Sequence, residues 1–134
     1  MTYLLDTTAF SALMRRAPKV RARVTNLGAN DLAVICTITR GEILYGLRRL
    51  PLGKRRQDLE AEASNLFNQL DCVPVPEAVA DRYAAIKSAA ERQGTPLDEN
   101  DLWIAATALS LNAVLVSTDS DFQRVNALRV EDWT

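Results

Sequence analysis

Short apolar segments of the kind that form buried strands recur along this chain, and longer helical segments separate them. Strands that alternate with helices favour a parallel sheet with helices packed on both of its faces. No repeat, low-complexity stretch or linker divides the chain. We therefore predict one domain over residues 1–134, an α/β fold with three α/β/α layers around a central parallel sheet. The predicted strands are residues 2–5, 32–36, 72–75, 113–117 and 128–130.

The helical segments show apolar spacing of the helical period and residues that start or stop a helix. Pro18 and Pro76 stand at helix starts, and Gly28 follows a helix end. Pro74 limits its strand to an edge of the sheet, because proline cannot donate to a central ladder. The predicted helices are residues 7–17, 18–27, 39–47, 54–70, 76–90 and 98–111.

Four acidic residues stand at the ends of apolar segments. Asp6 follows the first strand, and Asp119 follows the fourth. Glu42 lies just beyond the second strand, and Asp101 opens an alanine-rich helix. Residues beyond the carboxyl ends of parallel strands converge on one crevice, where four carboxylates repel one another unless a cation lies between them. The pattern therefore predicts a divalent metal site.

Each acid also has a purely structural explanation when it is considered alone. Aspartate caps helices, a Thr-x-x-Glu spacing fits a capping box, and aspartates are common in turns. Asp101, however, heads a helix too apolar to be solvated all round, where an unpaired carboxylate is costly. The joint pattern therefore favours a shared site. The structural alternatives are an N-cap at Asp6, a capping box of Thr39 and Glu42, an N-cap at Asp98 with Asp101 in the first turn, and a turn at Asp119 and Asp121.

Histidine is absent from the chain. Its absence excludes Ser-His-Asp and Cys-His triads and imidazole metal sites. Cys36 and Cys72 lie far apart in apolar, strand-like surroundings, so we expect two buried reduced thiols rather than a disulfide or zinc ligands. Only oxygen ligands remain, and they favour magnesium, manganese or calcium.

Carboxylates that hold one or two such ions suit phosphoryl-transfer chemistry. The metal polarises a phosphodiester, lowers the pKa of a bound water and stabilises charge on the leaving oxygen. Without histidine, water activated by the metal is the expected nucleophile. Proton transfer then falls to a carboxylate such as Asp119 or to solvent.

Two acid-free segments concentrate the positive charge. Residues 7–30 and 43–57 each carry +5 and the rest of the chain carries −11, which gives the net charge of −1. Phosphate contacts are local and release counterions, so these segments can follow a polyanionic backbone despite the acidic total. A solvated helix face is the alternative, although exposed helices usually mix both signs. The candidate substrate-binding residues are Arg15, Arg16, Lys19, Arg48, Arg49 and Arg55.

Two further features concern aromatic residues and location. Tyr45 and Trp103 could stack on bases, but aromatics within helices are more often core residues, and we expect that role here. No apolar run approaches the roughly 18 residues of a membrane span. Residues 1–6 lack the basic start and long apolar stretch of a signal peptide, so we expect a cytoplasmic protein without membrane association.

Taken together, four motifs resemble the PIN-domain family and, more narrowly, the VapC-type toxins of prokaryotic toxin–antitoxin pairs. They span residues 4–122 in the order and spacing of that family. The motifs are Leu4-Leu5-Asp6-Thr7-Thr8, Thr39-x-x-Glu42-Ile43-Leu44-Tyr45-Gly46, Asn100-Asp101-Leu102-Trp103-Ile104-Ala105-Ala106-Thr107-Ala108 and Val116-Ser117-Thr118-Asp119-x-Asp121-Phe122.

The resemblance implies a magnesium- or manganese-dependent endoribonuclease that cuts structured RNA, often tRNA or ribosomal RNA. It also implies a homodimer, and a cognate VapB-like antitoxin whose C-terminal segment lies across the active-site groove. The basic residues above would then bind RNA. Matched position by position, Asp6, Glu42 and Asp101 are the three central acids, Asp119 is the fourth and more variable one, Asp121 is an outer acid, and Thr7 and Ser117 lie beside the site.

Other functions are alternatives to this one. An aspartyl-phosphate phosphatase would need a second aspartate where Thr8 stands, and a lysine near the last acids, whereas the last lysine is Lys87. A receiver-type signalling domain lacks its acid pair for a similar reason. A catalytically silent RNA-binding or scaffolding module on the same fold would be favoured by loss of a central acid, and none is lost.

Overall fold

The computed structural model describes residues 1–134, and at its centre lies a five-stranded sheet in which all strand pairs are parallel. The strand order is β3-β2-β1-β4-β5, so β1 is central and β3 lies at an edge. The predicted parallel sheet and the predicted edge strand are both confirmed. The strands are β1 (Thr2–Leu5), β2 (Leu32–Cys36), β3 (Asp71–Val73), β4 (Val114–Val116) and β5 (Val130–Glu131).

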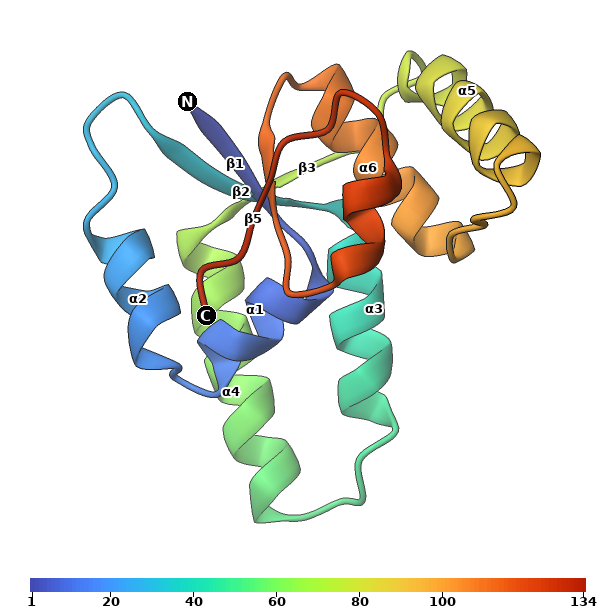
Figure 1. The fold of residues 1–134 in the computed structure, drawn as a ribbon. Coiled ribbons are helices and arrows are strands. Elements are labelled where there is room, and N and C mark those ends of the chain that lie inside the picture. The colour runs from blue at the N-terminus through green and yellow to red at the C-terminus, as the bar shows by residue number, and fades with distance from the viewer.

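Helices connect the strands and cover the sheet. Figure 1 shows α3 and α4 as a long hairpin that projects away from the sheet, with α5 at the outer side of the molecule beside α6. None of these helices is long and apolar enough to cross a membrane. The helices are α1 (Thr7–Met14), α2 (Pro18–Thr25), α3 (Thr37–Arg48), α4 (Lys54–Gln69), α5 (Val79–Arg92), α6 (Glu99–Ser110) and the short 3-10 helix η1 (Ser120–Arg124).

The central strands are apolar on both faces, because successive side chains of a strand point to opposite sides of the sheet. Leu5 and Ile35 pack with residues of α1, α2, α3 and α4 on one side. Leu4 and Val34 pack with residues of α6 and η1 on the other. Leu4 and Leu5 are both completely buried, so β1 is enclosed from both faces. This burial fixes the register of the strands, and with it the positions of the residues that follow them.

The structure corrects the prediction of a buried Cys72 and rules out one of the structural alternatives, the capping box at Thr39. Cys36 is buried as expected, but Cys72 is exposed, because β3 is a short edge strand. Thr39 does not cap α3, since that helix already begins at Thr37 after Cys36. The Thr39 hydroxyl lies inside the helix, fully buried and without a hydrogen-bond partner. The capping-box explanation for Glu42 therefore fails.

The expectation of a core role for the helix aromatics is wrong for Tyr45 and true only in part for Trp103. Tyr45 is 65% exposed on α3. Trp103 on α6 is half-buried and stacks on Tyr83 of α5, with ring centroids 3.9 Å apart and an interplanar angle of 7°. This stack joins the outlying α5 to α6.

Candidate active site

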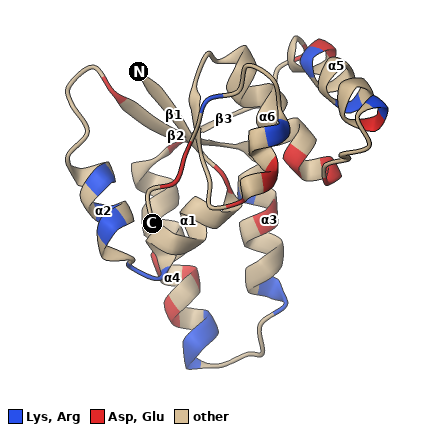
Figure 2. Ribbon diagram, in the orientation of Figure 1, with Lys and Arg blue, Asp and Glu red and all other residues tan.

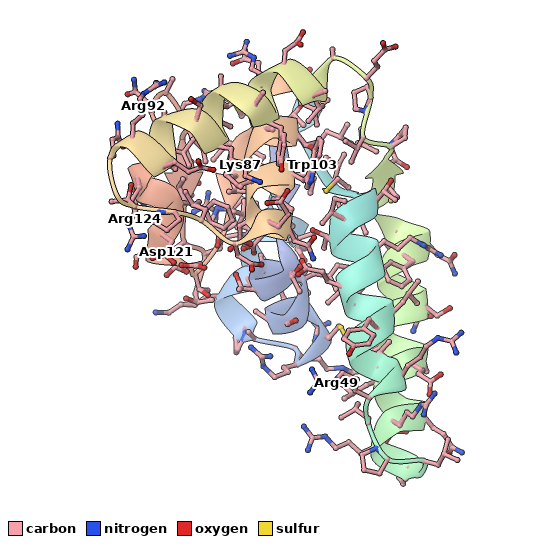
Figure 3. All side chains as sticks on the ribbon, turned by 90° about the vertical axis from the view of Figure 1, so that its right-hand side faces the viewer. Arg49, Lys87, Arg92, Trp103, Asp121 and Arg124 are labelled. Atoms are coloured by element: carbon pink, nitrogen blue, oxygen red, sulfur yellow. The ribbon has the colours of Figure 1, made fainter.

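The carboxyl ends of β1, β2 and β4 lie side by side, because β1 pairs with both of the other strands. Asp6 follows β1 directly, Asp119 follows β4, and Glu42 lies on α3, which continues from β2. Asp101 comes from the first turn of α6. The structure therefore brings the four predicted acids together at the carboxyl ends of the strands, where the charges of the other three act on Asp101. Figure 3 shows side-chain oxygen atoms gathered between α6 and α1.

Asp6 is the most enclosed of these acids, with only 2% of its surface exposed. Its carboxylate accepts hydrogen bonds from the Ala9 amide at 2.9 Å, the Thr8 hydroxyl at 2.6 Å and the Ser117 hydroxyl at 2.5 Å. Burial raises the pKa of the Asp6 carboxyl, and these hydrogen bonds oppose the rise. Asp6 is also the N-cap of α1, so its structural role and a role in the site coexist in one side chain.

The hydroxyl groups around Asp6 tie the loop after β4 to the start of α1. The Thr118 amide donates to Thr8 Oγ1 at 3.0 Å, and the Asp119 amide donates to Ser117 Oγ at 3.0 Å. Ser117 is 3% exposed and both accepts from Asp119 and donates to Asp6. The positions of Asp6 and Asp119 are therefore coupled through one buried hydroxyl.

Glu42 is held by two donors from different parts of the chain. Thr7 donates its hydroxyl to one carboxylate oxygen, and Asn100 Nδ2 donates to the other at 3.3 Å. Asn100 stands beside Asp101 on α6, so this contact bridges α3 and α6 across the site. Because each carboxylate oxygen of Glu42 accepts from a different donor, the two hydrogen bonds together fix the plane of the carboxylate.

Asp101 experiences the combined negative charge of the site. The pKa of Asp101 is raised from 3.8 to about 7. Burial is the largest cause of this rise, and the negative charge of Asp119 is the second. Asp98, Glu42 and Asp6 shift this pKa in the same direction. Asp98 precedes α6 as its N-cap residue, without a capping hydrogen bond from its side chain. An acid that is half protonated near neutral pH marks a place where a cation would be favourable.

Asp119 and Asp121 behave differently although they are two residues apart. Asp119 caps η1, and its Oδ1 accepts the Asp121 amide at 2.9 Å. The Asp121 carboxylate instead forms an ion pair with Arg124 at 3.1 Å. Figure 3 shows Asp121 and Arg124 next to each other at the margin of the site. Asp121 therefore lies outside the group of mutually repelling acids.

The site offers oxygen donors alone, which suit hard divalent cations. No three acidic, histidine or cysteine side chains converge closely enough to hold one ion by themselves as they stand. The arrangement consists instead of separately anchored carboxylates whose charges act on one another. The donor chemistry fits a divalent ion that keeps part of its water shell.

The predicted basic residues are only partly brought together. Arg15 and Arg55 line a groove of about 840 Å³ that also contains Thr7 and Glu42. Arg16 pairs with Glu62 at 3.2 Å, and Arg49 lies over the Tyr45 ring, 5.6 Å from its centroid. Lys19 and Arg48 line other surfaces, near Trp133 and Phe67 respectively. Apart from Arg40 near the start of α3, the basic residues of the hairpin lie at the far ends of α3 and α4, away from the acidic site, as Figure 2 shows.

Two residues at the site have no role in the sequence-based prediction, although both lie within its motifs. In the sequence, Thr8 is notable only because it stands where a phosphatase would have an aspartate. Asn100 is notable only because it precedes Asp101. A hydroxyl two residues after Asp6 and an amide next to Asp101 were the available signals. Their partners could not be predicted, because Thr8 contacts residues 109 or more positions away and Asn100 contacts Glu42, 58 positions away.

The model of the PIN domain matches residues 3–128 of this chain. Ribonuclease VapC1 of Haemophilus influenzae strain R2866 is 37% identical over 137 aligned positions, which cover 100% of this chain and 99% of the relative. The tRNA(fMet)-specific endonuclease VapC of Shigella flexneri is 28% identical, with 100% of this chain and 99% of the relative covered.

Solved structures show the same fold. The VapBC-1 structure from nontypeable Haemophilus influenzae contains a chain that is 35% identical, with a TM-score of 0.86 over 99% of this chain and 98% of that one. The VapBC2 structure from Rickettsia felis, bound to a promoter DNA fragment, gives a TM-score of 0.91 at 23% identity, with both chains covered completely. These full-length similarities agree with the four motifs and with the acidic site at the carboxyl ends of the parallel strands. The chain belongs to the PIN-domain family as one of its VapC ribonucleases.

Proposed function

We propose that this chain is the toxin of a toxin–antitoxin pair and cleaves structured RNA in a magnesium- or manganese-dependent reaction. The observation that carries the proposal is the state of Asp101, whose pKa burial and four neighbouring acids raise to about 7. A divalent cation would remove that repulsion and favour the carboxylate. The metal dependence typical of PIN-domain nucleases supports the same conclusion.

In this proposal Asp6, Glu42, Asp101 and Asp119 hold the metal, and Asp121 contributes from outside. Water would complete the octahedral shell, because the carboxylates do not converge on one point. A bound ion would polarise the scissile phosphodiester and lower the pKa of the attacking water.

The surrounding residues hold these acids and move the proton. Ser117 and Thr8 orient Asp6 through their hydroxyl groups. Asp119 accepts the amide of the η1 turn through Oδ1, while its Oδ2 has no partner within the chain. We propose that this free oxygen accepts the proton of the attacking water, since the chain has no histidine to do so.

The substrate and the inhibitor follow from the relatives. The Shigella relative is named for cleavage of tRNA(fMet), so tRNA is the first substrate to test. Several structural neighbours are VapBC complexes, which supports a VapB-like antitoxin as the partner. We propose that this antitoxin lies across the active-site groove. A homodimer and a cytoplasmic location are parts of the same proposal.

The experiment is cleavage of total cellular RNA and of purified tRNA by the purified protein. Each reaction is run with magnesium, manganese or a chelator, and with Asp101→Asn purified identically. Asp81→Asn, an exposed acid on α5, is the matched control. Discrete fragments that need both metal and Asp101 are expected. Binding of RNA without cleavage by the wild-type protein would contradict the proposal and leave a binding module.

A further inference from the structure

One end of the groove between α1, α3 and α4 lies at the acidic site. Thr7 and Glu42, which are joined by a hydrogen bond, form that end. From there the groove follows α3, which rises about 9 Å between Glu42 and its last residue, Arg48, and continues to Leu50. Its other end lies between the end of α1 and the start of α4, at Arg15 and Arg55.

The charge at the far end is not neutralised within the chain. Lys54, which also lines the groove, pairs with Asp58 at 3.3 Å, and Arg56 pairs with Glu60 at 3.0 Å. Arg15 and Arg55 are exposed, and neither guanidinium group takes part in an ion pair or a hydrogen bond within the chain. These two guanidinium groups are therefore free to bind phosphate.

The floor between the two ends is apolar. Ile43 and Leu47 are buried beneath it, and Met14, Leu50 and Leu59 are half-buried along it. A surface with carboxylates at one end, free guanidinium groups at the other and an apolar floor between them is complementary to a strand of nucleotides. Phosphates would contact the arginines, and unstacked bases would contact the floor.

The helix wall of the groove contains a glycine. Gly46 lies in the interior of α3, where glycine weakens a helix. A Cβ built at Gly46 meets no atom within 4 Å, so a side chain there would project into open space along the groove. Gly41, on the same helix, is also exposed and also has open space around a Cβ, but it does not line the groove.

We propose that this groove binds an unpaired stretch of the RNA substrate next to the scissile phosphate, with Arg15 and Arg55 on its phosphates and its bases over Met14, Leu50 and Leu59. The inference rests on the proposed ribonuclease function and specifies how its substrate is held. A duplex cannot place its bases on the apolar floor, so the groove selects single-stranded regions of a folded RNA.

The test measures RNA binding in an Asp101→Asn background, so that cleavage does not interfere. The probe is a fluorescent single-stranded RNA of mixed sequence, compared with the same sequence in a duplex. We expect Gly46→Leu to weaken binding of the single strand by about tenfold, which corresponds to the loss of about one base contact. Gly41→Leu is expected to bind as the parent does, and thermal unfolding verifies that both variants are folded.

A second pair of variants tests the arginines. The double variant Arg15→Gln with Arg55→Gln is expected to reduce the slope of log affinity against log salt by about 1.4, because each phosphate contact on a single strand contributes about 0.7. The control is Arg21→Gln with Arg82→Gln, which removes the same charge from α2 and α5 and leaves the groove unchanged.

The outcomes separate this inference from the proposed function. The groove is not the RNA path if Gly46→Leu and the double arginine variant both bind single-stranded RNA as tightly as the parent. This conclusion would hold even if the wild-type protein cleaves RNA. A polypeptide would then be the occupant to test. Equal loss of affinity in the groove variants and their controls also overturns the inference. Loss of binding confined to the groove variants supports it, even if the wild-type protein binds RNA without cleaving it.

Discussion

Ser117 donates its hydroxyl to the Asp6 carboxylate at 2.5 Å, across 111 positions of the sequence. The same oxygen accepts the Asp119 amide at 3.0 Å. One buried hydroxyl thus links the acid after the central strand β1 to the acid after its neighbour β4. Two further hydrogen bonds join the same two segments, from the Asp6 amide to the Val116 carbonyl at 3.0 Å and from the Thr118 amide to Thr8 Oγ1 at 3.0 Å. Ser117 is the residue whose side chain contacts both acids.

Ser117→Ala tests the link between the two loops. It leaves the buried Asp6 carboxylate with one donor fewer, which should lower the free energy of unfolding by about 1–3 kcal/mol. Urea denaturation measures this change, and RNA cleavage should fall together with it. Ser110→Ala, at an exposed position that ends α6, is the control. Stability equal to that of the wild type would show that the Asp6 contact contributes nothing.

The raised pKa of Asp101 predicts how stability depends on pH in the absence of divalent metal. A folded-state pKa of about 7, above the ordinary 3.8, means that the folded state holds a proton that the unfolded state releases. The contribution of Asp101 to stability is therefore fully present below about pH 4 and is lost as pH rises toward 7. After allowance for solvent screening of this partly exposed group, the loss amounts to about 2 kcal/mol.

Chelator-treated protein is the sample for this measurement, with denaturation curves between pH 4 and pH 8. Asp101→Asn should flatten the dependence and be more stable than the wild type at pH 8. Magnesium or manganese should restore wild-type stability at pH 8, because an ion that binds only the folded state stabilises it by mass action. A wild-type curve that rises between pH 5 and pH 8 in chelator would contradict the assignment.

Much of this molecule could be predicted from its sequence, because local and global signals agree in the central strands. Residues 3–5 and 32–36 are apolar, as expected of strands enclosed from both faces, and the structure places β1 and β2 there. The convergence of Asp6 and Asp119 then follows from parallel pairing alone.

What could not be predicted depends on contacts between distant segments. Pro74 marks the strand of Cys72 as an edge strand, but no residue near Cys72 shows that its side chain is exposed there. The contact of Asn100 with Glu42 depends on how α6 packs beside α3. The basic residues illustrate the same limit, because Arg55 is free while its neighbour Arg56 is paired with Glu60. Charge in a sequence does not show which side chains are already neutralised.

Trp103 is predicted to stabilise the α5 helix rather than to bind bases, because Tyr83 already covers one face of its ring. Trp103→Ala should lower the free energy of unfolding by about 2–3 kcal/mol, somewhat less than a fully buried tryptophan. RNA affinity measured on the folded variant should stay within twofold of the parent. Tyr45→Ala, which removes an exposed ring, should leave stability nearly unchanged. A loss of RNA affinity in Trp103→Ala without loss of stability would instead indicate stacking on a base.

Asn100→Ala should release one oxygen of Glu42 while it leaves every proposed metal ligand in place. Residues that orient metal ligands typically contribute about 10- to 100-fold to metal affinity or activity. The metal concentration for half-maximal cleavage should therefore rise, with RNA affinity in an Asp101→Asn background unchanged. Asn68→Ala, an exposed amide on α4, is the control for loss of an asparagine. In chelator, Asn100→Asp should be less stable than Asn100→Ala, because it adds a negative charge next to Glu42. Manganese should restore part of that stability. Equal metal requirements in wild type and Asn100→Ala would show that Thr7 alone fixes the Glu42 carboxylate.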